Sequence, residues 1–326
     1  MNANFTIEEV IVEEVSHCLV CGSDDHSILF EAQDTLHGLP GTWSVRRCSN
    51  CGHGFISPRP DRDGISLYYP DDYSPFASPI TADESHGWKA MLKRVVGRVF
   101  DPREVLIPAD QIPGDAVEVG CGSGRFLVEL ARRGWRVQGV EPSSSAIVGL
   151  TSTHGVTVTQ GTVDTVDFAP SSFDLVAGLM VLEHLHEPMA DTRKIASWIR
   201  PGGWFMGSVP NCASWEFRVF GPDWFALQVP THLSHFTPSS LRRLLREAGF
   251  DSPQILGQRN VSNLMIHLGR ALGRRGWPLA RVFLDYPVRG PRTLRLAAWP
   301  MATLLATVGQ AGRMTFLARK PSLPGD

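Results

Sequence analysis

The middle of the chain alternates short apolar runs with helical patterns. Residues 116–119 form an apolar run around Glu118, which predicts a buried strand, and 126–131 continue with the spacing of a helix. A second apolar run at 135–140 predicts the neighbouring strand. A strand, a glycine-rich turn, a helix and a second strand make the nucleotide-binding corner of an α/β domain. We therefore expect helices on a mainly parallel sheet.

The stretch before this corner has the pattern of a connector. Prolines within 57–60 indicate a stiff, extended link, because proline restricts its own φ and the residue before it. Three tyrosines follow within 68–73, and two interpretations stay open for them: packing between domains, or lining of a substrate site. Over 85–100 a covering helix is predicted. Its apolar residues at helical spacing are Trp88, Met91, Leu92, Val95, Val96 and Val99.

Length and composition place the chain among globular enzymes. With 326 residues it can hold one large core and a small additional module. It is 43% hydrophobic and 20% charged, and its net charge of −2 gives no global indication of nucleic acid or membrane. The acidic N-terminus lacks the pattern of a signal peptide. The longest apolar stretch, 296–312, contains Pro300 and is too short to span a bilayer. These features predict a cytoplasmic protein.

Two CxxC motifs near the N-terminus change this picture by adding a metal site. They are Cys18 with Cys21 and Cys48 with Cys51, and a glycine follows each pair. Four thiolates complete a tetrahedral shell, so the pattern predicts structural Zn²⁺ in a module over 1–56. The glycines permit the positive φ that such turns need. A redox motif would need only one pair beside a βαβ unit. Three nearby histidines are expected at the surface: His17, His26 and His53.

The turn after the first predicted strand is rich in glycine. Gly120, Gly122 and Gly124 would let a ligand approach the backbone closely at the start of the following helix. Glu141 ends the second strand about 20 residues later, where the acceptor for a ribose diol belongs. From these residues alone, NAD remains an alternative ligand.

Further motifs follow in a fixed order. They are Glu118 with the turn 120–124, Phe173-Asp174-Leu175-Val176, Leu182-Glu183-His184-Leu185 with Pro188, Arg200-Pro201-Gly202-Gly203, Ser208-Val209-Pro210-Asn211, His232 to Thr237, and Leu241 to Phe250. The series resembles the class I S-adenosylmethionine-dependent methyltransferases, whose first motif is hhE/DhGxGxG. The resemblance covers 113–255 and implies a Rossmann-like sheet with helices on both faces. With the CxxC motifs, the proline link and the tyrosines, the chain resembles zinc-containing methyltransferases of sugar and natural-product pathways.

This resemblance implies roles for the residues of the corner. Gly120, Gly122 and Gly124 would contact the methionine part of S-adenosylmethionine. Glu118 would orient its amino group, directly or through water, and Glu141 would hold the ribose hydroxyls.

The adenine side departs from the family pattern. The third strand usually carries an acidic residue near adenine, but Gln160-Gly161-Thr162 stands there in this chain. We expect Thr162 or a backbone amide to replace the acid, and Met180 and Leu182 to line the adenine.

The segment after the fifth strand holds the candidates for a general base. His232 and His235 follow that strand on the carboxyl side of the sheet, where ligands bind in such folds. For His235 a helix entry is the competing interpretation, with Thr237 as cap and Pro238 in the first turn. His184 is expected to fix a loop. The aromatic residues before His232 form either a lid or a buried cluster; they are Trp215, Phe217, Phe220, Trp224 and Phe225.

The segment 256–311 is basic, with interleaved Leu, Trp and Phe. It precedes a predicted last strand at 313–320, so we interpret it as a helical insertion ahead of that strand. Three interpretations stay open: a solvated helical cap, a surface for an anionic membrane or a lipid-linked substrate, and a site for a nucleotide-charged substrate.

The sequence thus predicts a zinc module at 1–56, a connector at 57–112, a catalytic domain at 113–255, the insertion at 256–311 and a last strand with a tail at 312–326. The predicted activity is methyl transfer to O or C of a small molecule, such as a sugar nucleotide, glycan or natural-product intermediate. One alternative is an RNA methyltransferase, against which the zinc region is not strongly basic. The other is a regulatory subunit that binds S-adenosylmethionine without turnover.

Overall fold

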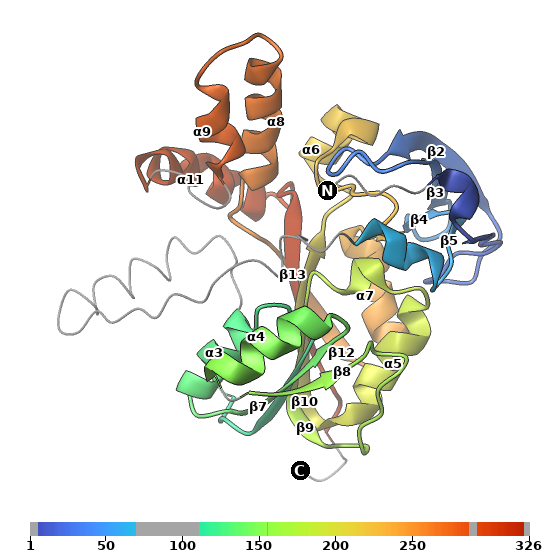
Figure 1. Ribbon diagram of the computed structural model, residues 1–326. Coiled ribbons are helices and arrows are strands. Elements are labelled where there is room, and N and C mark those ends of the chain that lie inside the picture. Colours follow the sequence, from blue (N-terminus) through green and yellow to red (C-terminus); the bar gives the residue numbers. More distant parts are fainter. Residues whose placement is uncertain (1–5, 70–110, 155, 287–291, 323–326) are drawn as a thin grey trace.

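The computed structural model describes residues 6–69, 111–154, 156–286 and 292–322. The expected covering helix over 85–100 lies outside these residues, as does the third tyrosine of the connector. Among the described residues, no helix is both long and apolar enough to cross a bilayer. Figure 1 shows a central twisted sheet with helices on its two faces, and a smaller β-rich module near its upper end.

The central sheet has seven strands in the order β12-β13-β10-β9-β6-β7-β8. Its strands are β6 (Asp115–Val119), β7 (Arg136–Glu141), β8 (Thr157–Gln160), β9 (Phe173–Leu179), β10 (Ile199–Pro210), β12 (Asp251–Gly257) and β13 (Arg313–Arg319). Neighbours from β8 to β10 pair in parallel, whereas β13 is antiparallel to both β10 and β12. The predicted strands at 116–119 and 135–140 and the last antiparallel strand are confirmed.

Helices cover both faces because the crossovers from β6 to β7, from β7 to β8 and from β9 to β10 each carry one. Figure 1 shows α3 and α4 on one face and α5 and α7 on the other. The helices are α3 (Arg125–Arg132), α4 (Ser144–His154), α5 (Pro188–Trp198) and α7 (Pro238–Glu247). The strands between them are buried on both faces: Leu175, Val176 and Ala177 of β9 are inaccessible to solvent. This double coverage explains why the strands appear in the sequence as continuous apolar runs.

The N-terminal module is a second sheet, in the order β11-β4-β3-β2. Three of its strands come from the first 56 residues, namely β2 (His26–Gln33), β3 (Thr42–Cys48) and β4 (Gly54–Ile56). The fourth, β11 (Ser234–His235), belongs to the chain after the fifth strand of the central sheet and pairs with Phe55 and Gly54. The module is therefore joined to the catalytic part by a shared sheet.

The proline link is also structured. Within it, β5 (Arg59–Pro60) pairs with β1 (Val12–Glu13), and the short helix η2 (Gly64–Tyr68) follows; another short helix, η1 (Ile7–Glu9), precedes β1. The Arg59 side chain is 3% exposed and contacts Glu13, the carbonyl of His186 and Glu187. The link thus fastens the module to the segment before α5.

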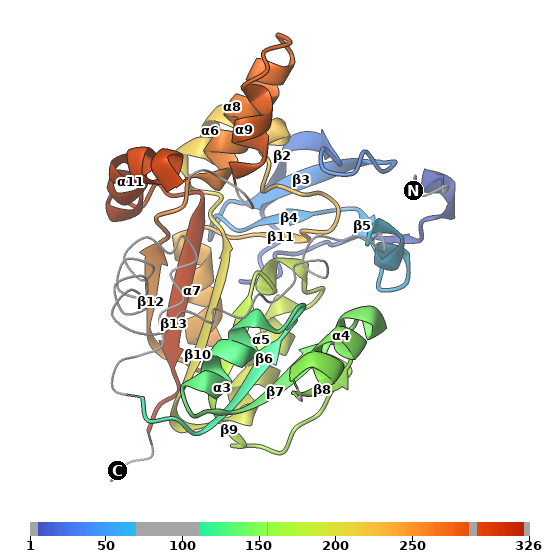
Figure 2. The same cartoon turned by 60° about the vertical axis from the view of Figure 1, so that its left-hand side comes forward.

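The described part of the predicted insertion holds three helices. They are α8 (Ser262–Gly273), α9 (Ala280–Leu284) and α11 (Arg292–Thr307). In Figures 1 and 2, α8 and α9 run side by side as a hairpin that projects away from the central sheet. Two short elements lie between β10 and β11, α6 (Trp215–Phe220) and η4 (Gly221–Asp223), and the short helix η3 (Leu182–His184) follows β9.

Candidate active site

The glycine turn after β6 adopts a conformation that needs glycine. Gly120, Gly122 and Gly124 have φ of +63°, +49° and +67°, in the left-handed region that other residues avoid. Gly124 is the N-cap of α3, and a Cβ atom there would lie 1.9 Å from Cδ2 of Leu150. The turn therefore presents bare backbone at the carboxyl edge of the sheet, beside the start of a helix, as a bound ligand requires.

Glu141 closes this corner from the neighbouring strand. Its carboxylate accepts hydrogen bonds from the backbone N–H of Gly122 (2.7 Å) and of Ser143 (2.9 Å). The side chain is buried, and this burial raises its pKa, while the two N–H donors act in the opposite direction. Glu141 thus holds the glycine turn in place. Its contact with ribose remains a prediction.

Glu118 of β6 faces this corner, and its carboxyl group lacks some of its hydrogen-bond partners. The residue is 4% exposed, and its Oε2 has no hydrogen-bond partner in the structure. Burial raises its pKa well above the ordinary value, and the nearby charge of Glu141 raises it further. A buried, unpaired carboxylate oxygen is costly, so it fits a site that takes up a positively charged amino group.

Thr162 and Met180 lie at the ends of the neighbouring strands. Thr162 follows β8 and is exposed; its hydroxyl bonds Asp164 and its backbone N–H donates to Oγ1 of Thr165 at 2.8 Å. This hydroxyl therefore stabilises its own turn. Met180 follows β9 with φ of +58° and donates its N–H to the carbonyl of Ser208 at 2.8 Å. Both residues stand at the carboxyl edge, and their adenine contacts remain predictions.

A second polar cluster lies at the same edge, after β9. Glu183, His184 and His232 each offer one ligand or proton-transfer atom, and these atoms lie within 4.8 Å of one another. Glu183 is inaccessible to solvent, and neither of its carboxylate oxygens has a hydrogen-bond partner in the structure. Burial raises its pKa to about 8, although the charge of Arg313 opposes the shift.

The raised pKa of Glu183 makes stability depend on pH. The folded protein keeps this proton up to about pH 8, whereas the unfolded chain releases it near the ordinary pKa of 4.5. Its contribution to stability is therefore present below pH 4.5 and is lost as the pH rises toward 8. We expect the free energy of unfolding of Glu183→Gln, relative to that of the wild type, to rise by about 1.4 kcal/mol per pH unit in this window. Thermal unfolding of both proteins at pH 5.5 and 7.5 tests this; a constant difference would contradict the buried, protonated carboxyl.

The loop around His232 fixes the orientation of its ring. Nδ1 lies 3.0 Å from the carbonyl oxygen of Ala226, and the backbone N–H donates to the carbonyl of Gln228 at 3.0 Å. The ring meets that of His184 edge to face, with centroids 4.7 Å apart. Burial, with the nearby His184 and His235, lowers the pKa of His232 well below its usual range. The imidazole is therefore neutral near pH 7.

His184 fixes the loop, as the sequence predicted. Its Nδ1 lies 2.9 Å from the carbonyl oxygen of Thr231 and 2.9 Å from the hydroxyl of Tyr69. Burial lowers its pKa to about 4. Tyr69 thereby links the connector to the cluster. Tyr68, in contrast, packs against Trp43 and donates its hydroxyl to the carbonyl of Pro40 at 2.7 Å.

His235 lies in a different place from His232. It sits in β11, opposite Gly54, and its buried Nε2 has no partner in the structure. The predicted helix entry is confirmed, because the side chain of Thr237 accepts from the N–H of Ser240 at 3.2 Å at the start of α7. The role of His235 as a base remains a prediction.

His53 corrects one expectation. The sequence predicted a surface histidine, but His53 is inaccessible to solvent. Its ring packs against Phe236 and stacks on Phe55, with centroids 4.9 Å and 6.2 Å away. Pairing of β11 with β4 brings the catalytic part of the chain over this ring, and sequence reasoning did not foresee that pairing. His17 is exposed as expected, and His26 is half-buried.

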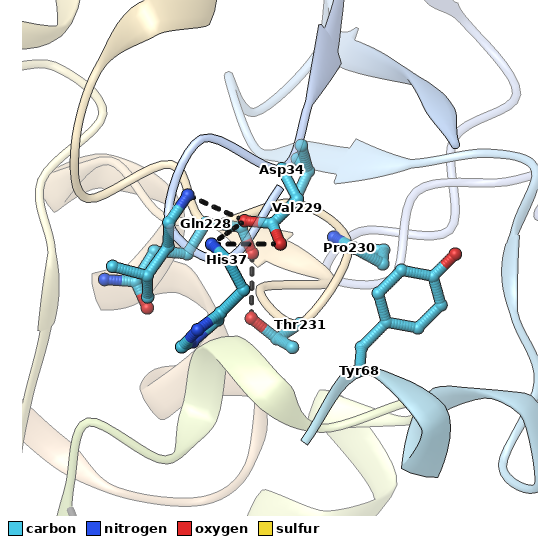
Figure 3. A pocket seen from close by; sticks show the side chains of 8 residues that line it. Asp34, His37, Tyr68, Gln228, Val229, Pro230 and Thr231 are labelled. Carbon is cyan, nitrogen blue, oxygen red and sulfur yellow. Dashed lines mark hydrogen bonds between the residues drawn. The ribbon is translucent and has the colours of Figure 1, made fainter. Parts of the chain in front are cut away.

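A small cleft opens beside the second cluster, between the two modules (Figure 3). Its lining residues are Asp34, Leu36, His37, Tyr68, Gln228, Val229, Pro230 and Thr231. The Asp34 carboxylate accepts from the N–H groups of Leu36 and His37, which holds the loop on the N-terminal side. Thr231 contacts His184 through its carbonyl, so the cleft and the cluster share one wall.

The aromatic residues before His232 form mainly a buried cluster. Phe217 and Trp224 are buried and join the core that contains Trp43, Ile56 and Tyr68 of the N-terminal part. Phe217 meets Phe30 with ring centroids 5.9 Å apart. Only Trp215 is largely exposed among the five, at 41%. These side chains therefore bind the two modules together.

The four cysteines converge as the spacing predicted. The sulphur atoms of Cys18 and Cys51, and those of Cys21 and Cys48, lie 3.5 Å apart, and all four fall within 4.8 Å of one another. Four Zn–S bonds of about 2.3 Å in a tetrahedron need a similar spacing. The glycines after the two pairs have φ of +69° and +73°, as expected. The donor set and its geometry fit Zn²⁺.

The comparisons with known proteins identify the family of this chain. The family model for a methyltransferase domain matches residues 91–254, half of the chain. The protein belongs to the class I S-adenosylmethionine-dependent methyltransferases. Ubiquinone biosynthesis O-methyltransferase of Nitrosospira multiformis is 30% identical over 155 residues, which are 44% of this chain and 65% of that one. The enzyme of the same name from Burkholderia pseudomallei strain 1710b is 31% identical over 160 residues, or 45% and 68%.

Solved structures give a weaker match. An S-adenosylmethionine-dependent methyltransferase of Thermotoga maritima aligns over 71% of this chain and 94% of its own, with 18% identity and a TM-score of 0.45. This chain spans about two thirds of the length of these two curated relatives, and the matches take in less than half of this chain.

Glu141 gives a direct test of the cofactor corner. Glu141→Ala removes both the predicted ribose acceptor and the brace of the glycine turn, so affinity for S-adenosylmethionine should fall by one to two orders of magnitude, about 1.5–3 kcal/mol. Isothermal titration calorimetry measures this. Asp167→Ala provides a control, because its carboxylate is exposed and pairs with Lys194. Equal affinities of wild type and Glu141→Ala would contradict the assignment.

Proposed function

We propose that this methyltransferase transfers its methyl group to a hydroxyl of a small-molecule acceptor. S-adenosylmethionine supplies a methyl group on a sulfonium centre, so the protein mainly aligns the reactants and removes a proton. The observation that carries the proposal is the buried cluster of Glu183, His184 and His232. It follows β9, the strand parallel and adjacent to β6, so it stands at the same edge as the glycine turn.

Within this cluster we propose His232 as the general base that takes the proton from the acceptor hydroxyl. When Nδ1 donates its hydrogen to the Ala226 carbonyl, Nε2 carries a lone pair and can accept the acceptor's proton. The carboxyl of Glu183 lies within reach of the imidazolium that forms and can balance its charge. His184 positions the loop through Thr231. His235, in the shared sheet, is the second candidate.

Cofactor binding rests on the corner described above. The unpaired oxygen of Glu118 fits the ammonium group of the methionine part, and Glu141 would hold the ribose. The turn 120–124 would contact the methionine part, with Met180 on the adenine side. Thr162 would have to give up a bond within its own turn to contact adenine, because its hydroxyl and its backbone N–H both have partners there.

The acceptor is best sought among hydroxylated small molecules. The names of the relatives specify O-methylation, which favours O over C. The cleft beside His184 is lined by the loop at 34–37 and by Thr231, so the N-terminal module would help to select the acceptor. We propose a sugar nucleotide, a glycan or a natural-product intermediate as the acceptor. The four cysteines would hold a structural Zn²⁺, because they leave no position open for catalysis.

The experiment uses methyl-labelled S-adenosylmethionine and a bacterial extract separated into small molecules, lipids, RNA and protein. We expect label in the small-molecule or lipid fraction, and mass spectrometry then gives the methylated atom. Label in RNA would favour an RNA methyltransferase instead. Binding of the cofactor without label in any fraction would favour a regulatory subunit.

A further inference from the structure

The α8–α9 hairpin carries an unusual combination of charge and exposed apolar groups. Eight arginines and a single acidic residue, Asp285, occur in the insertion at 256–311, whereas the whole chain has 31 basic and 33 acidic residues. Four of these arginines, Arg270, Arg274, Arg275 and Arg281, lie within the hairpin, and no acidic residue lies between Ser262 and Leu284. A face of this kind complements a strongly anionic partner.

The tip of the hairpin is the most exposed part of it. Every residue from 273 to 279 is exposed, including Arg274 and Arg275. Trp277 and Leu279 are 55% and 56% exposed, although side chains of this size are usually covered. No described carboxylate forms an ion pair with Arg274 or Arg275. In both views the tip is the point of the hairpin farthest from the central sheet (Figures 1 and 2).

Further apolar side chains extend this surface along the helices. On the hairpin they are Leu268, Val282 and Leu284, on α11 they are Leu296, Met301 and Leu304, and Val308 follows directly after α11. Each is at least 38% exposed. Leucine and tryptophan next to arginine are the composition of segments that lie in the interface of an anionic bilayer. Nucleic acid would demand the charge but would not require so many exposed aliphatic groups.

The second half of α8 is anchored close to the candidate active site. Arg270 donates to the carbonyl of Thr35 at 2.9 Å, and its guanidinium lies 5.4 Å from the ring centroid of Phe225. His267 accepts from the N–H of Phe225 at 3.0 Å and stacks on Phe220. Thr35 lies between residues of the cleft. The hairpin and the cleft are therefore held in a fixed relation.

We propose that the α8–α9 hairpin docks this protein on an anionic lipid bilayer. Trp277 and Leu279 enter the interface, while Arg274, Arg275 and Arg281 contact lipid phosphates. The contacts of Arg270 then hold the cleft near the lipid surface, within reach of an acceptor carried by the membrane. This docking is independent of which group is methylated, so vesicle binding tests it separately from the proposed activity.

The test is flotation of the full zinc-loaded chain with vesicles of neutral phosphatidylcholine, with and without a quarter of phosphatidylglycerol. We expect binding to the anionic vesicles only, weakened by salt. Arg274→Glu with Arg275→Glu should lower the partition coefficient at least about tenfold, and Trp277→Ala should lower it as well. Arg132→Glu with Arg193→Glu is the control, since these arginines are exposed on α3 and α5.

Titration with S-adenosylmethionine confirms that each variant is folded. Equal binding to neutral and anionic vesicles, or the same loss in the control variant, would overturn the proposal. So would a dimer in light scattering that Trp277→Ala dissociates without vesicle binding by the wild type, because the hairpin would then contact a second copy of the chain.

Discussion

Replacing His232 by asparagine should lower the rate constant for methyl transfer by a factor of about 10² to 10⁴, the usual contribution of a positioned general base. The affinity for S-adenosylmethionine should stay within about twofold, because His232 lies in the loop between β10 and β11, whereas the glycine turn follows β6. Asparagine can still donate from the position of Nδ1 to the carbonyl of Ala226, which lies 3.0 Å away in the wild type. The loop therefore keeps its anchor and loses only the proton acceptor.

Single-turnover kinetics with the identified acceptor, alongside calorimetry with the cofactor, measures both effects. His17→Asn is the control, since His17 is exposed. An unchanged rate for His232→Asn would remove His232 as the base and leave His235. The same three groups could also hold a metal ion. If a chelator abolished the rate at constant zinc content and a divalent cation restored it, His232 would be a metal ligand and not the general base.

The dependence of the rate on pH has a predictable sign. The pKa of His232 lies well below 6.5, because the ring is buried beside two further histidines. The base is active in its neutral form, so its protonation lowers the rate only in acid. The rate should not fall through titration of His232 between pH 8 and 6.5. A pKa near 6.5 in the profile of kcat/KM would show that the imidazole is hydrated in the free enzyme.

The sheet and its cofactor corner could be read from the sequence because local patterns determine them. Gly120, Gly122 and Gly124 occupy a left-handed turn, Glu141 ends its strand as predicted, and the four cysteines converge. In each case a short stretch contains both the signal and its cause: a positive φ, a strand end or a pair of thiols in one turn.

The second cluster could not be read in this way, because it depends on contacts between distant segments. Glu183 is an unremarkable glutamate in the sequence, and only the fold removes it from water and places His232 next to it. Tyr69 reaches His184 across 115 positions of the chain. The pairing of β11 with β4 likewise joins residues about 180 positions apart and buries His53. The motif Leu182-Glu183-His184-Leu185 with Pro188 was the available signal, since it drew attention to His184.

The shared sheet connects the N-terminal module to the loop of the candidate active site. Cys18 and Cys48 belong to one core with Phe55 of β4 and Phe236, which follows β11. A backbone hydrogen bond closes each CxxC turn: the N–H groups of Gly22 and Gly52 donate to the carbonyls of Cys18 and Cys48. Without the ion, four cysteine side chains and the two turns would lose their common anchor. Because β4 holds β11, disorder in the module should spread to the loop that carries His232.

Removal of zinc should therefore abolish methyl transfer and spare cofactor binding. Structural zinc contributes about 10–16 kcal/mol in small zinc domains, far more than a small module can replace. We expect Cys48→Ser, or treatment with a strong chelator, to lower the rate at least about 100-fold, the equivalent of 2.7 kcal/mol or more. Affinity for S-adenosylmethionine should change little, because the glycine turn lies on the other sheet.

Metal analysis measures the loss of zinc, limited proteolysis measures the disorder of the N-terminal module, and calorimetry measures the affinity for S-adenosylmethionine. Cys212→Ala, at a buried thiol outside the cluster, should keep the zinc. If Cys48→Ser lost its zinc yet kept full activity, the module would be a separate unit, and the cleft between it and the cluster would have no role in catalysis.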